Sequence, residues 1–186
     1  MNKWLDKWTK NEHKQYKVNT FEILNSYLNF APKNILDIGC GLAYESELFQ
    51  KTYNSNLYLL DGDFAETENN TRDTDYNTVD SFKFYNTIST LKESFNARKL
   101  QYTFIDANNI ILDKDKKFDL VYSILSCGFH YPITAYVNLI KEHTTKNSKI
   151  ILDIRNSSFA EQSKYFEVVK IVKQYKKYKT LEIKLK

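Results

Sequence analysis

Two glycines close to an acid, in Asp37-Ile-Gly39-Cys40-Gly41, form the part of the sequence best suited to hold a small ligand. They end a short apolar run that is typical of a buried strand. Because glycine lacks a side chain, the backbone at Gly39 and Gly41, with Cys40 between them, can approach a ligand closely. A helix expected next would present its unpaired N–H groups to the same ligand. This segment therefore predicts a binding loop between a strand and a helix.

A second acid, Asp61, is followed by Gly62 and lies about twenty residues beyond the glycine loop, at the end of another apolar run. In doubly wound α/β folds, a carboxylate at this place accepts hydrogen bonds from the two hydroxyls of a ribose. The carboxyl ends of the strands are also where such folds bind ligands. We therefore expect Asp61 to contact a ribose. Asp63 is a rival for this contact, and a plain turn residue is the alternative reading of Asp61.

The elements that must position these residues alternate between strands and helices. The patterns predict strands at 34–38, 57–60, 100–105, 117–124 and 149–154, and helices at 42–52, 79–97, 132–143 and 157–164. Such alternation is typical of a parallel sheet with helices on both faces. Two final strands, 167–174 and 180–186, predict an antiparallel hairpin at one edge. In the last strand we expect Leu181, Ile183 and Leu185 to face inward and Glu182, Lys184 and Lys186 to face outward.

The first thirty residues are predicted to be helical. Trp4, Leu5 and Trp8 fall on one helical face, and a second helix is expected over 20–29, with Asn19 as its cap. These helices are candidates for a lid over the ligand, or for an amphipathic segment packed on the sheet. The chain shows no internal repeat or linker. We therefore expect one domain over 1–186, with helices at 1–30 and a ligand-binding core at 33–186.

Composition points to a soluble globular protein, with 42% hydrophobic and 27% charged residues. The sequence contains no apolar stretch long enough for a membrane span, and its first residues do not read as a signal peptide. The two cysteines, Cys40 and Cys127, do not form a CxxC pair, so we expect free thiols and a cytoplasmic protein. The three histidines and two cysteines lack metal-ligand spacing, so no metal site is expected.

Charge is unevenly distributed along the chain. Residues 61–80 contain seven acids and one arginine, whereas residues 164–186 contain eight lysines and two acids. The plainest interpretation is a solvated loop and a solvated sheet edge, because edge strands often carry lysine. The acidic stretch is alternatively a gate, or a surface that attracts a cationic substrate. A net charge of +4 is weak support for a polyanionic partner.

Four segments together resemble the class I S-adenosylmethionine-dependent methyltransferases. Residues 37–43 are similar to motif I of this family, (D/E)xGxGxG, with Ala43 in place of the third glycine. Asp61, the segment Phe104-Ile105-Asp106-Ala107 and the strand at 117–123 match further family segments in the same order. The resemblance covers about residues 33–186. It implies a Rossmann-like, doubly wound, mostly parallel seven-stranded sheet, with S-adenosylmethionine as cofactor and S-adenosylhomocysteine as product.

The resemblance also implies a role for each matching residue. Asp37 would order the glycine loop and contact the methionine part of the cofactor, which the two glycines admit. Asp61 would hold the ribose, and Asp106, followed by Ala107, would contact the adenine amine. Ser123 would flank the methyl-bearing end. Taken singly, Asp37 is also explained as a loop cap, and Asp106 as a surface turn acid.

A dinucleotide-dependent dehydrogenase is the competing interpretation of the glycine loop. Its fingerprint, GxGxxG, needs a small third residue for close packing of helix against strand. Tyr44 stands at that position here. This substitution disfavours the dehydrogenase.

The methyl acceptor is expected beside the segment Ser-Cys-Gly-Phe-His130-Tyr131-Pro that follows the fourth strand. Imidazole titrates near neutral pH, so His130 is the candidate base for a hydroxyl acceptor, and an oxygen nucleophile is slightly favoured. Tyr131 and Tyr16 are candidate residues for binding the acceptor. Each of these side chains can alternatively serve in packing. Cys127 is not expected to act as a nucleophile, because no base is paired with it.

A small-molecule acceptor is favoured over nucleic acid. The segment after the fourth strand lacks the (D/N/S)PP(Y/F/W) and Pro-Cys motifs of enzymes that methylate bases, and the chain has no room for a target-recognition domain. A nucleic-acid methyltransferase that uses the lysine-rich hairpin remains the second alternative. A non-catalytic cofactor-binding subunit is the first, and other chemistry on the same cofactor is the third. The sequence leaves the oligomeric state open.

Overall fold

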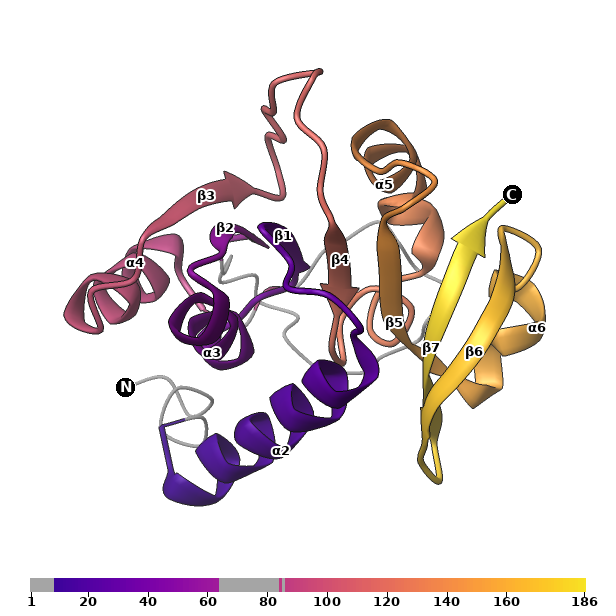
Figure 1. Cartoon of the computed structure of the whole chain (residues 1–186), viewed down its shortest axis with the longest axis horizontal. Helices are drawn as coiled ribbons and strands as arrows, with labels where there is room; N and C mark the ends of the chain where they lie inside the picture. Colours follow the sequence, from indigo (N-terminus) through magenta and orange to yellow (C-terminus); the bar gives the residue numbers. More distant parts are fainter. Residues whose placement is uncertain (1–8, 64–83, 85) are drawn as a thin grey trace, which may run out of the picture.

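A seven-stranded sheet forms the centre of the computed structural model, which describes residues 9–63, 84 and 86–186 (Figure 1). The strands are β1 (Asn34–Ile38), β2 (Asn56–Asp61), β3 (Tyr102–Asp106), β4 (Leu120–Ser123), β5 (Lys149–Arg155), β6 (Phe166–Gln174) and β7 (Tyr178–Leu185). They lie in the order β3-β2-β1-β4-β5-β7-β6. Strands β1 to β5 are parallel, and β7 runs antiparallel between β5 and β6. The predicted doubly wound sheet with a C-terminal antiparallel hairpin is therefore confirmed.

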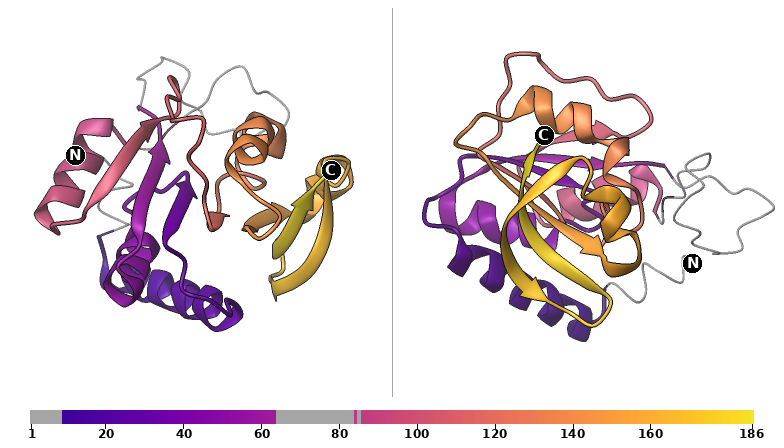
Figure 2. Two further views of the ribbon diagram at one scale, coloured as in Figure 1. Left: turned by 45° about the horizontal axis from the view of Figure 1, so that its top comes forward. Right: turned by 90° about the vertical axis from the view of Figure 1, so that its right-hand side faces the viewer.

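Helices cover both faces of this sheet, as Figures 1 and 2 show. They are α2 (Asn11–Tyr27), α3 (Tyr44–Tyr53), α4 (Ile88–Ala97), α5 (Val137–His143) and α6 (Phe159–Gln162), with 3₁₀ turns η1 (Ile133–Ala135) and η2 (Asn156–Ser158). Side chains of α2, α3 and α4 share one hydrophobic core with the sheet, and those of α5 and α6 pack against a second. In β1, Ile35 faces the first core and Leu36 the second, so the strand is apolar on both faces.

Helix α2 packs beside α3 and against β6, and its side chains reach β7. Its Phe21 ring meets the Phe49 ring of α3 edge-on, with 4.9 Å between centroids. Near its end the Tyr27 hydroxyl donates to Glu182 of β7, and near its start the hydroxyls of Tyr16 and Tyr178 lie 3.3 Å apart. Because Tyr178 pairs with the last residue of β5, the first half of α2 lies where the parallel strands end.

The boundary predicted within the N-terminal helices is wrong. Helix α2 runs without interruption from Asn11 to Tyr27, so Asn19 lies inside it and is not a cap. The Asn19 side chain accepts a hydrogen bond from Gln15 at 2.9 Å on the exposed surface. Residues 11–19 include Glu, Lys and Gln, which favour helix, and this preference outweighs the local capping signal. Of the other predicted N-terminal positions, Trp4, Leu5 and Trp8 lie outside the described residues.

The predicted helix over 79–97 begins later within the described residues, at Ile88. Thr87 is its cap, because its hydroxyl accepts from the Thr90 N–H at 3.2 Å. The Ile88 N–H donates to a carboxylate oxygen of Asp63 at 3.0 Å. The Thr87 hydroxyl and the Asp63 carboxylate thus accept hydrogen bonds from two of the N–H groups that the first turn of a helix leaves unpaired. Positions 79–83 lie outside the described residues, as do positions 64–80 of the acidic stretch.

Three further expectations need correction. The helix predicted from Pro132 is divided into the turn η1 and helix α5, and the segment at 157–164 forms η2 and the short α6.

Glu182 does not face outward to solvent, because α2 covers that face of β7 and buries it. There it accepts from Tyr27 and, at 2.8 Å, from the Lys149 ammonium. The lowered pKa of Glu182 follows because these bonds outweigh the opposing effect of burial.

The hairpin ends in an edge strand, β6, that is irregular. Its register against β7 shifts between Val168 and Lys170 and again between Ile171 and Lys173. Val168 and Ile171 remain 42% and 49% exposed. No helix among residues 9–63 and 86–186 combines the length and apolar character needed to cross a membrane.

The contact between α2 and α3 predicts the effect of removing one ring. Phe49 is fully buried and touches Phe21 and Tyr122, so Phe49→Ala should lower the free energy of unfolding by about 3–5 kcal/mol. Urea unfolding followed by circular dichroism measures this change. The control is Ile111→Ala at a side chain that is 76% exposed, which should change stability by about 0.5 kcal/mol or less. Equal losses in both variants would contradict the packing described.

Candidate functional site

The glycine loop lies between the end of β1 and the start of α3, as predicted. Gly39 and Gly41 have φ angles of +72° and +49°, in the left-handed region that glycine tolerates. The N–H groups of Gly39 and Cys40 both donate to the Leu60 carbonyl, at 2.7 and 3.1 Å, which ties the loop to β2. Ala43, with φ +51°, also adopts the left-handed conformation before α3 begins.

The space beside Gly39 is filled by the protein itself. A Cβ atom at Gly39 would lie 1.9 Å from the hydroxyl oxygen of Ser126. Ser126 is buried and belongs to the segment after β4. The missing side chain at Gly39 therefore lets two loops of the site meet. Sequence reasoning missed Ser126, because a serine inside a loop carries no pattern that marks it.

Asp61 connects the end of β2 to the glycine loop. Its carboxylate accepts from the Gly41 N–H at 2.7 Å and from the Gly62 N–H at 2.9 Å. Burial raises the pKa of Asp61 to about 6, although both backbone bonds act to lower it. Asp63 is exposed and its carboxylate binds the start of α4. This geometry favours Asp61 over Asp63 as the acid that faces a ligand.

Neighbouring positions complete this end of the sheet. Asp106 stands opposite Asp61 in the register of β2 and β3, and the Ala107 N–H donates to the Asp61 carbonyl at 2.9 Å. The Asp106 carboxylate accepts from the N–H two residues further on, at 2.9 Å. A Cβ at Gly62 would lie 2.1 Å from the ring of Phe84, which packs directly against it. The structure thus brings together Asp61, Gly62, Asp106 and Ala107.

Asp37 points into the protein rather than toward the glycine loop. One of its carboxylate oxygens accepts from the hydroxyls of Ser46 in α3 and Tyr122 in β4, each at 2.8 Å. Burial, followed by the charge of Glu45, raises the pKa of Asp37 to about 7. Its polar contacts join β1, α3 and β4. The expected contact of Asp37 with the methionine part of a cofactor stays a prediction.

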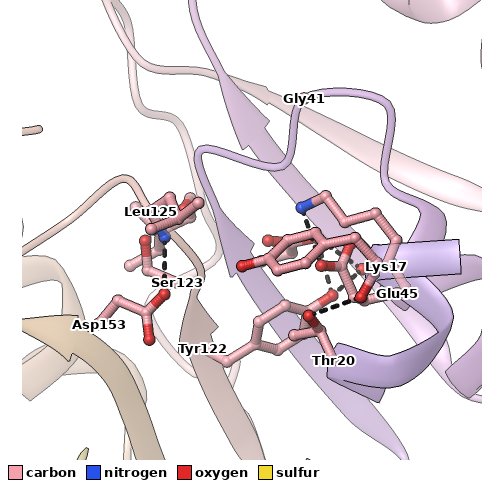
Figure 3. Close-up of polar contacts among 12 residues, drawn as sticks. Lys17, Thr20, Gly41, Glu45, Tyr122, Ser123, Leu125 and Asp153 are labelled. Carbon is pink, nitrogen blue, oxygen red and sulfur yellow. Dashed lines mark hydrogen bonds and ion pairs between the residues drawn. The ribbon is translucent and has the colours of Figure 1, made fainter. Parts of the chain in front are cut away.

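An ion pair beneath the glycine loop was not expected from the sequence. Glu45, in the first turn of α3, is 2% exposed, and the Lys17 ammonium of α2 lies 2.8 Å from its carboxylate. Figure 3 shows the two side chains pointing toward one another below the loop at Gly41. Burial acts to lower the pKa of Lys17, but the charge and hydrogen bond of Glu45 outweigh it and the pKa is raised. In the sequence, Lys17 is one of many lysines and nothing distinguishes it.

Ser123 and Asp153 hold the segment after β4. The buried Ser123 hydroxyl donates to the Ile38 carbonyl at 2.7 Å and accepts from the Cys127 N–H at 2.8 Å. Asp153 of β5 accepts from the Leu125 N–H at 3.1 Å and from the Thr180 hydroxyl at 2.6 Å. Leu125 is thereby held in the left-handed conformation, with φ +57°. Burial raises the pKa of Asp153 to about 7. The Ser123 hydroxyl ties β1 to the segment after β4.

The same segment is rigidly folded where it carries His130 and Tyr131. The Ser126 carbonyl accepts the N–H groups of residues 129, 130 and 131 at 3.0, 2.7 and 3.1 Å. The buried Gln162 side chain donates to the Gly128 carbonyl and accepts from the Ile133 N–H, both at 3.0 Å. His130 and Tyr131 are each half-buried on this support. Their backbone geometry is therefore fixed before any ligand binds.

The predicted acceptor residues fall into two places. Tyr16 and His130 lie at opposite ends of a row of rings, with Tyr178 and Phe129 between them. Tyr131 instead lies toward β2, with its ring centroid 6.0 Å from that of Phe84. The row and Tyr131 both belong to the edge where the parallel strands end.

The two cysteines are buried and free. Burial raises the pKa of the Cys40 thiol, and it raises that of the Cys127 thiol to about 12. A thiol attacks as its thiolate, so Cys127 is a poor nucleophile at neutral pH. Within the described residues, no three His, Cys, Asp or Glu side chains are arranged to hold a metal ion.

Among the described residues, carboxyl groups outnumber cations at this edge of the sheet. Four buried carboxyl groups converge on it, from Asp37, Glu45, Asp61 and Asp153. Within the described part of the chain, Lys17 is the cation paired with this group. The pKa values of Asp61, at about 6, and of Asp37 and Asp153, at about 7, mean that part of this group is protonated at neutral pH. A ligand that brings positive charge would favour the ionised forms of these acids, because an opposite charge nearby stabilises a carboxylate.

Titration of Asp37 should appear in the stability of the protein. Its folded pKa of about 7 exceeds the ordinary value, so the folded state binds more protons and loses stability as pH rises from about 4 to 7. Asp37→Asn removes this titration. The stability of the variant relative to wild type should therefore improve between pH 4 and 8, by up to about 4 kcal/mol.

Urea unfolding at several pH values measures this difference. The matched control is Asp115→Asn at an exposed acid. A difference between Asp37→Asn and wild type that stays constant with pH would contradict the burial of an acid with a raised pKa.

Known proteins are similar to this chain in fold but not in sequence. No protein-family model matches the chain, and no curated protein is similar to it in sequence. Solved structures do match. Protein PH0226 from Pyrococcus horikoshii OT3 superposes with a TM-score of 0.61 and 16% identity, covering 94% of this chain and 91% of that one.

Two further structures carry descriptive names. The ribosomal protein L11 methylase from Lactobacillus delbrueckii subsp. bulgaricus has a TM-score of 0.58 and 13% identity, over 94% of this chain and 80% of that one. The plantazolicin methyltransferase BpumL, solved with SAH and a desmethylPZN analog, has a TM-score of 0.56 and 20% identity, over 92% of this chain. The present chain spans 57% of the length of BpumL. The chain therefore has the fold of the class I, Rossmann-like S-adenosylmethionine-dependent methyltransferases.

Proposed function

We propose that the protein is an S-adenosylmethionine-dependent methyltransferase that acts on a small-molecule acceptor. The observation that carries this proposal is Asp61, a buried acid at the end of β2 whose carboxylate binds the glycine loop. It stands in a cluster of buried carboxyl groups. The proposal is supported by structural neighbours named as methyltransferases, of which BpumL was solved with SAH.

The charge of the site agrees with this cofactor better than with a dinucleotide. S-Adenosylmethionine carries one net positive charge, from its sulfonium, ammonium and carboxylate, whereas NAD carries one net negative charge, from its pyrophosphate and its nicotinamide ring. A buried acidic cluster attracts the first and repels the second. Tyr44, which replaces the small residue of the dinucleotide fingerprint, packs under the Arg98 guanidinium at 4.7 Å. That ring occupies the start of α3.

Individual residues can be given roles in holding the cofactor. A carboxylate offers about four lone pairs, so Asp61 can accept from two ribose hydroxyls while it keeps both backbone bonds. Asp106, which is paired with Asp61 on the adjacent strand β3, would accept from the adenine amine. Lys17 would face the carboxylate of the methionine part, since it is the cation of this cluster. Asp37 and Ser123 would position the loops.

The chain's contribution to the reaction is positioning and proton removal. When bound, S-adenosylmethionine supplies an electrophilic methyl group. Fixing the acceptor in line with that group removes much of the entropic barrier, and the rigid segment after β4 is built for this task. His130 would take the proton of a hydroxyl acceptor, which slightly favours oxygen over other nucleophiles. The raised pKa of Cys127 argues against covalent catalysis by its thiol.

The first prediction concerns the cofactor. In calorimetric titrations, S-adenosylmethionine and S-adenosylhomocysteine should bind and NAD should not. Asp61→Ala should weaken both bindings by about tenfold or more, because two charge-assisted hydrogen bonds are lost. Asp63→Ala, at an acid that binds the start of α4, is the matched control and should bind as wild type does. Circular dichroism checks that each variant is folded.

Three outcomes would redirect the proposal. Binding of NAD in preference would favour the dehydrogenase, and binding of neither cofactor would leave a scaffold or partner-dependent subunit. Cofactor binding without turnover on any small acceptor would favour the non-catalytic subunit.

The second prediction concerns His130. With an acceptor found by screening small hydroxyl compounds, His130→Gln should lower kcat by roughly 10²–10⁴, as expected for loss of a general base. Binding of S-adenosylhomocysteine should stay unchanged, because His130 is assigned to the acceptor side. Wild type should lose kcat at acidic pH as the base becomes protonated, and this decline should be absent from the variant. An unchanged kcat would mean that positioning alone accelerates the transfer.

A further inference from the structure

We propose that Arg98 is a positioning residue for the cofactor site. Its guanidinium holds the end of the glycine loop in a left-handed conformation at Ala43, the position that lacks a glycine. This inference rests on the proposed function, since it names a residue that shapes the site for the same cofactor.

Every second residue of the glycine loop adopts a left-handed conformation. The φ angles are +72° at Gly39, +49° at Gly41 and +51° at Ala43. Glycine adopts this conformation readily, whereas the Cβ atom of an alanine crowds the following carbonyl oxygen. That crowding disfavours the conformation by roughly five- to thirtyfold. The end of the loop is therefore the place where its conformation needs support from other parts of the chain.

The peptide groups on both sides of Ala43 are held by hydrogen bonds. In the preceding peptide, the Ala43 N–H donates to the Cys40 carbonyl at 2.8 Å, and the Leu42 carbonyl accepts from the Arg98 guanidinium. In the following peptide, the Ala43 carbonyl accepts from the Glu47 N–H of α3 at 2.9 Å. Because each peptide is planar, fixing the two planes fixes the φ and ψ angles of the residue between them. Arg98 therefore acts directly on the conformation of Ala43.

Arg98 bonds to both of these sides at once from the end of α4. One terminal nitrogen donates to the Leu42 carbonyl, and the other donates to the Glu47 carboxylate. Its Nε donates to the Ser94 carbonyl, one turn earlier in α4, at 3.2 Å. A lysine could not make this arrangement, because its ammonium is a single point of charge whereas the guanidinium is a rigid fork.

Burial and stacking keep the guanidinium in this place. The side chains of Arg98 and Glu47 are 20% and 13% exposed. The guanidinium carbon lies 4.7 Å from the centre of the Tyr44 ring, at the start of α3, and 5.9 Å from that of Phe95. A partly buried ion pair is screened little by salt, and a guanidinium stacked on a ring has a defined orientation. Arg98 is therefore a fixed support for the loop.

The loop held in this way carries a contact of the candidate cofactor site. The Gly41 N–H, two residues before Ala43, donates to the Asp61 carboxylate at 2.7 Å. A loop that relaxed at Ala43 would move this N–H relative to Asp61. Only molecules with the loop in its present conformation would then bind well, and the apparent affinity would fall in proportion to their fraction. We therefore expect Arg98 to act on cofactor affinity.

The test is a pair of substitutions whose effects are coupled. Arg98→Met keeps an aliphatic side chain but removes the donors, and it should weaken binding of S-adenosylhomocysteine by about tenfold. Ala43→Gly should leave the wild-type affinity within about twofold, because the loop is already in place. In the double variant, Ala43→Gly should restore the affinity to within about threefold of wild type. A residue that only stabilised the fold would weaken binding equally in both backgrounds.

Lys51→Met is the matched control. The Lys51 ammonium is a second cation on the Glu47 carboxylate, at 2.6 Å, and its side chain is 67% exposed. This variant removes a charge from the same carboxylate but keeps the bond from Arg98 to Leu42, so it should bind S-adenosylhomocysteine as wild type does. Circular dichroism checks that each variant is folded. If Arg98→Met does not fold, Arg98→Lys is compared in the same two backgrounds and should show the same rescue.

A measurement without ligand separates this inference from the proposed function. Ala43→Gly should raise the urea midpoint more in wild type than in Arg98→Met, because only Arg98 keeps the alanine in its strained conformation. An unchanged affinity in Arg98→Met, or a loss that Ala43→Gly does not restore, would overturn the role of Arg98. Failure of S-adenosylhomocysteine to bind wild type would overturn the proposed function instead. Equal shifts of the urea midpoint in the two backgrounds would then overturn the role of Arg98 as well.

Discussion

The structure of the site depends on how buried carboxylates find donors. A buried acid is stable only when hydrogen bonds replace the water it has lost. Three buried acids each have two donors. Asp37 accepts from hydroxyls of α3 and β4, and Asp61 accepts from N–H groups of the glycine loop and of Gly62. Asp153 accepts from a hydroxyl of β7 and from an N–H of the segment after β4. Each acid thereby fastens a strand end to a neighbouring element. The raised pKa values show that these donors compensate only part of the loss.

This incomplete compensation links architecture to binding. The buried acids at the strand ends lower the stability of the folded state and gather carboxyl groups there. The two apolar cores of the sheet offset this loss of stability. The segment after β4 lies between these carboxyl groups and the row of rings, and it contacts both sides. One face of the segment meets the glycine loop through Ser126, and the other meets β7 through Phe129. The segment after β4 therefore connects the glycine loop to the C-terminal hairpin.

Much of the fold was predictable from the sequence, because it is encoded in local patterns. Apolar runs marked the strands, and the glycines marked the turn after β1. Asp61 was predictable because its place at a strand end has a chemical meaning. Lys17, Glu45 and Ser126 were not, since their importance arises from contacts between segments remote in sequence. Glu182 was misplaced for the same reason: alternation along β7 does not reveal that α2 covers the face on which Glu182 lies.

The irregular edge strand β6 affects whether molecules of this protein associate edge to edge at high concentration. A straight nine-residue edge with valines and an isoleucine exposed would invite the edge of another molecule to extend the sheet. The two register shifts bend the line of backbone donors and acceptors, and Lys170 and Lys173 stand where each shift ends. A second molecule that aligned with this edge would bring its own lysines against these two. The hairpin can thus carry an apolar surface at high concentration and resist growth into fibrils.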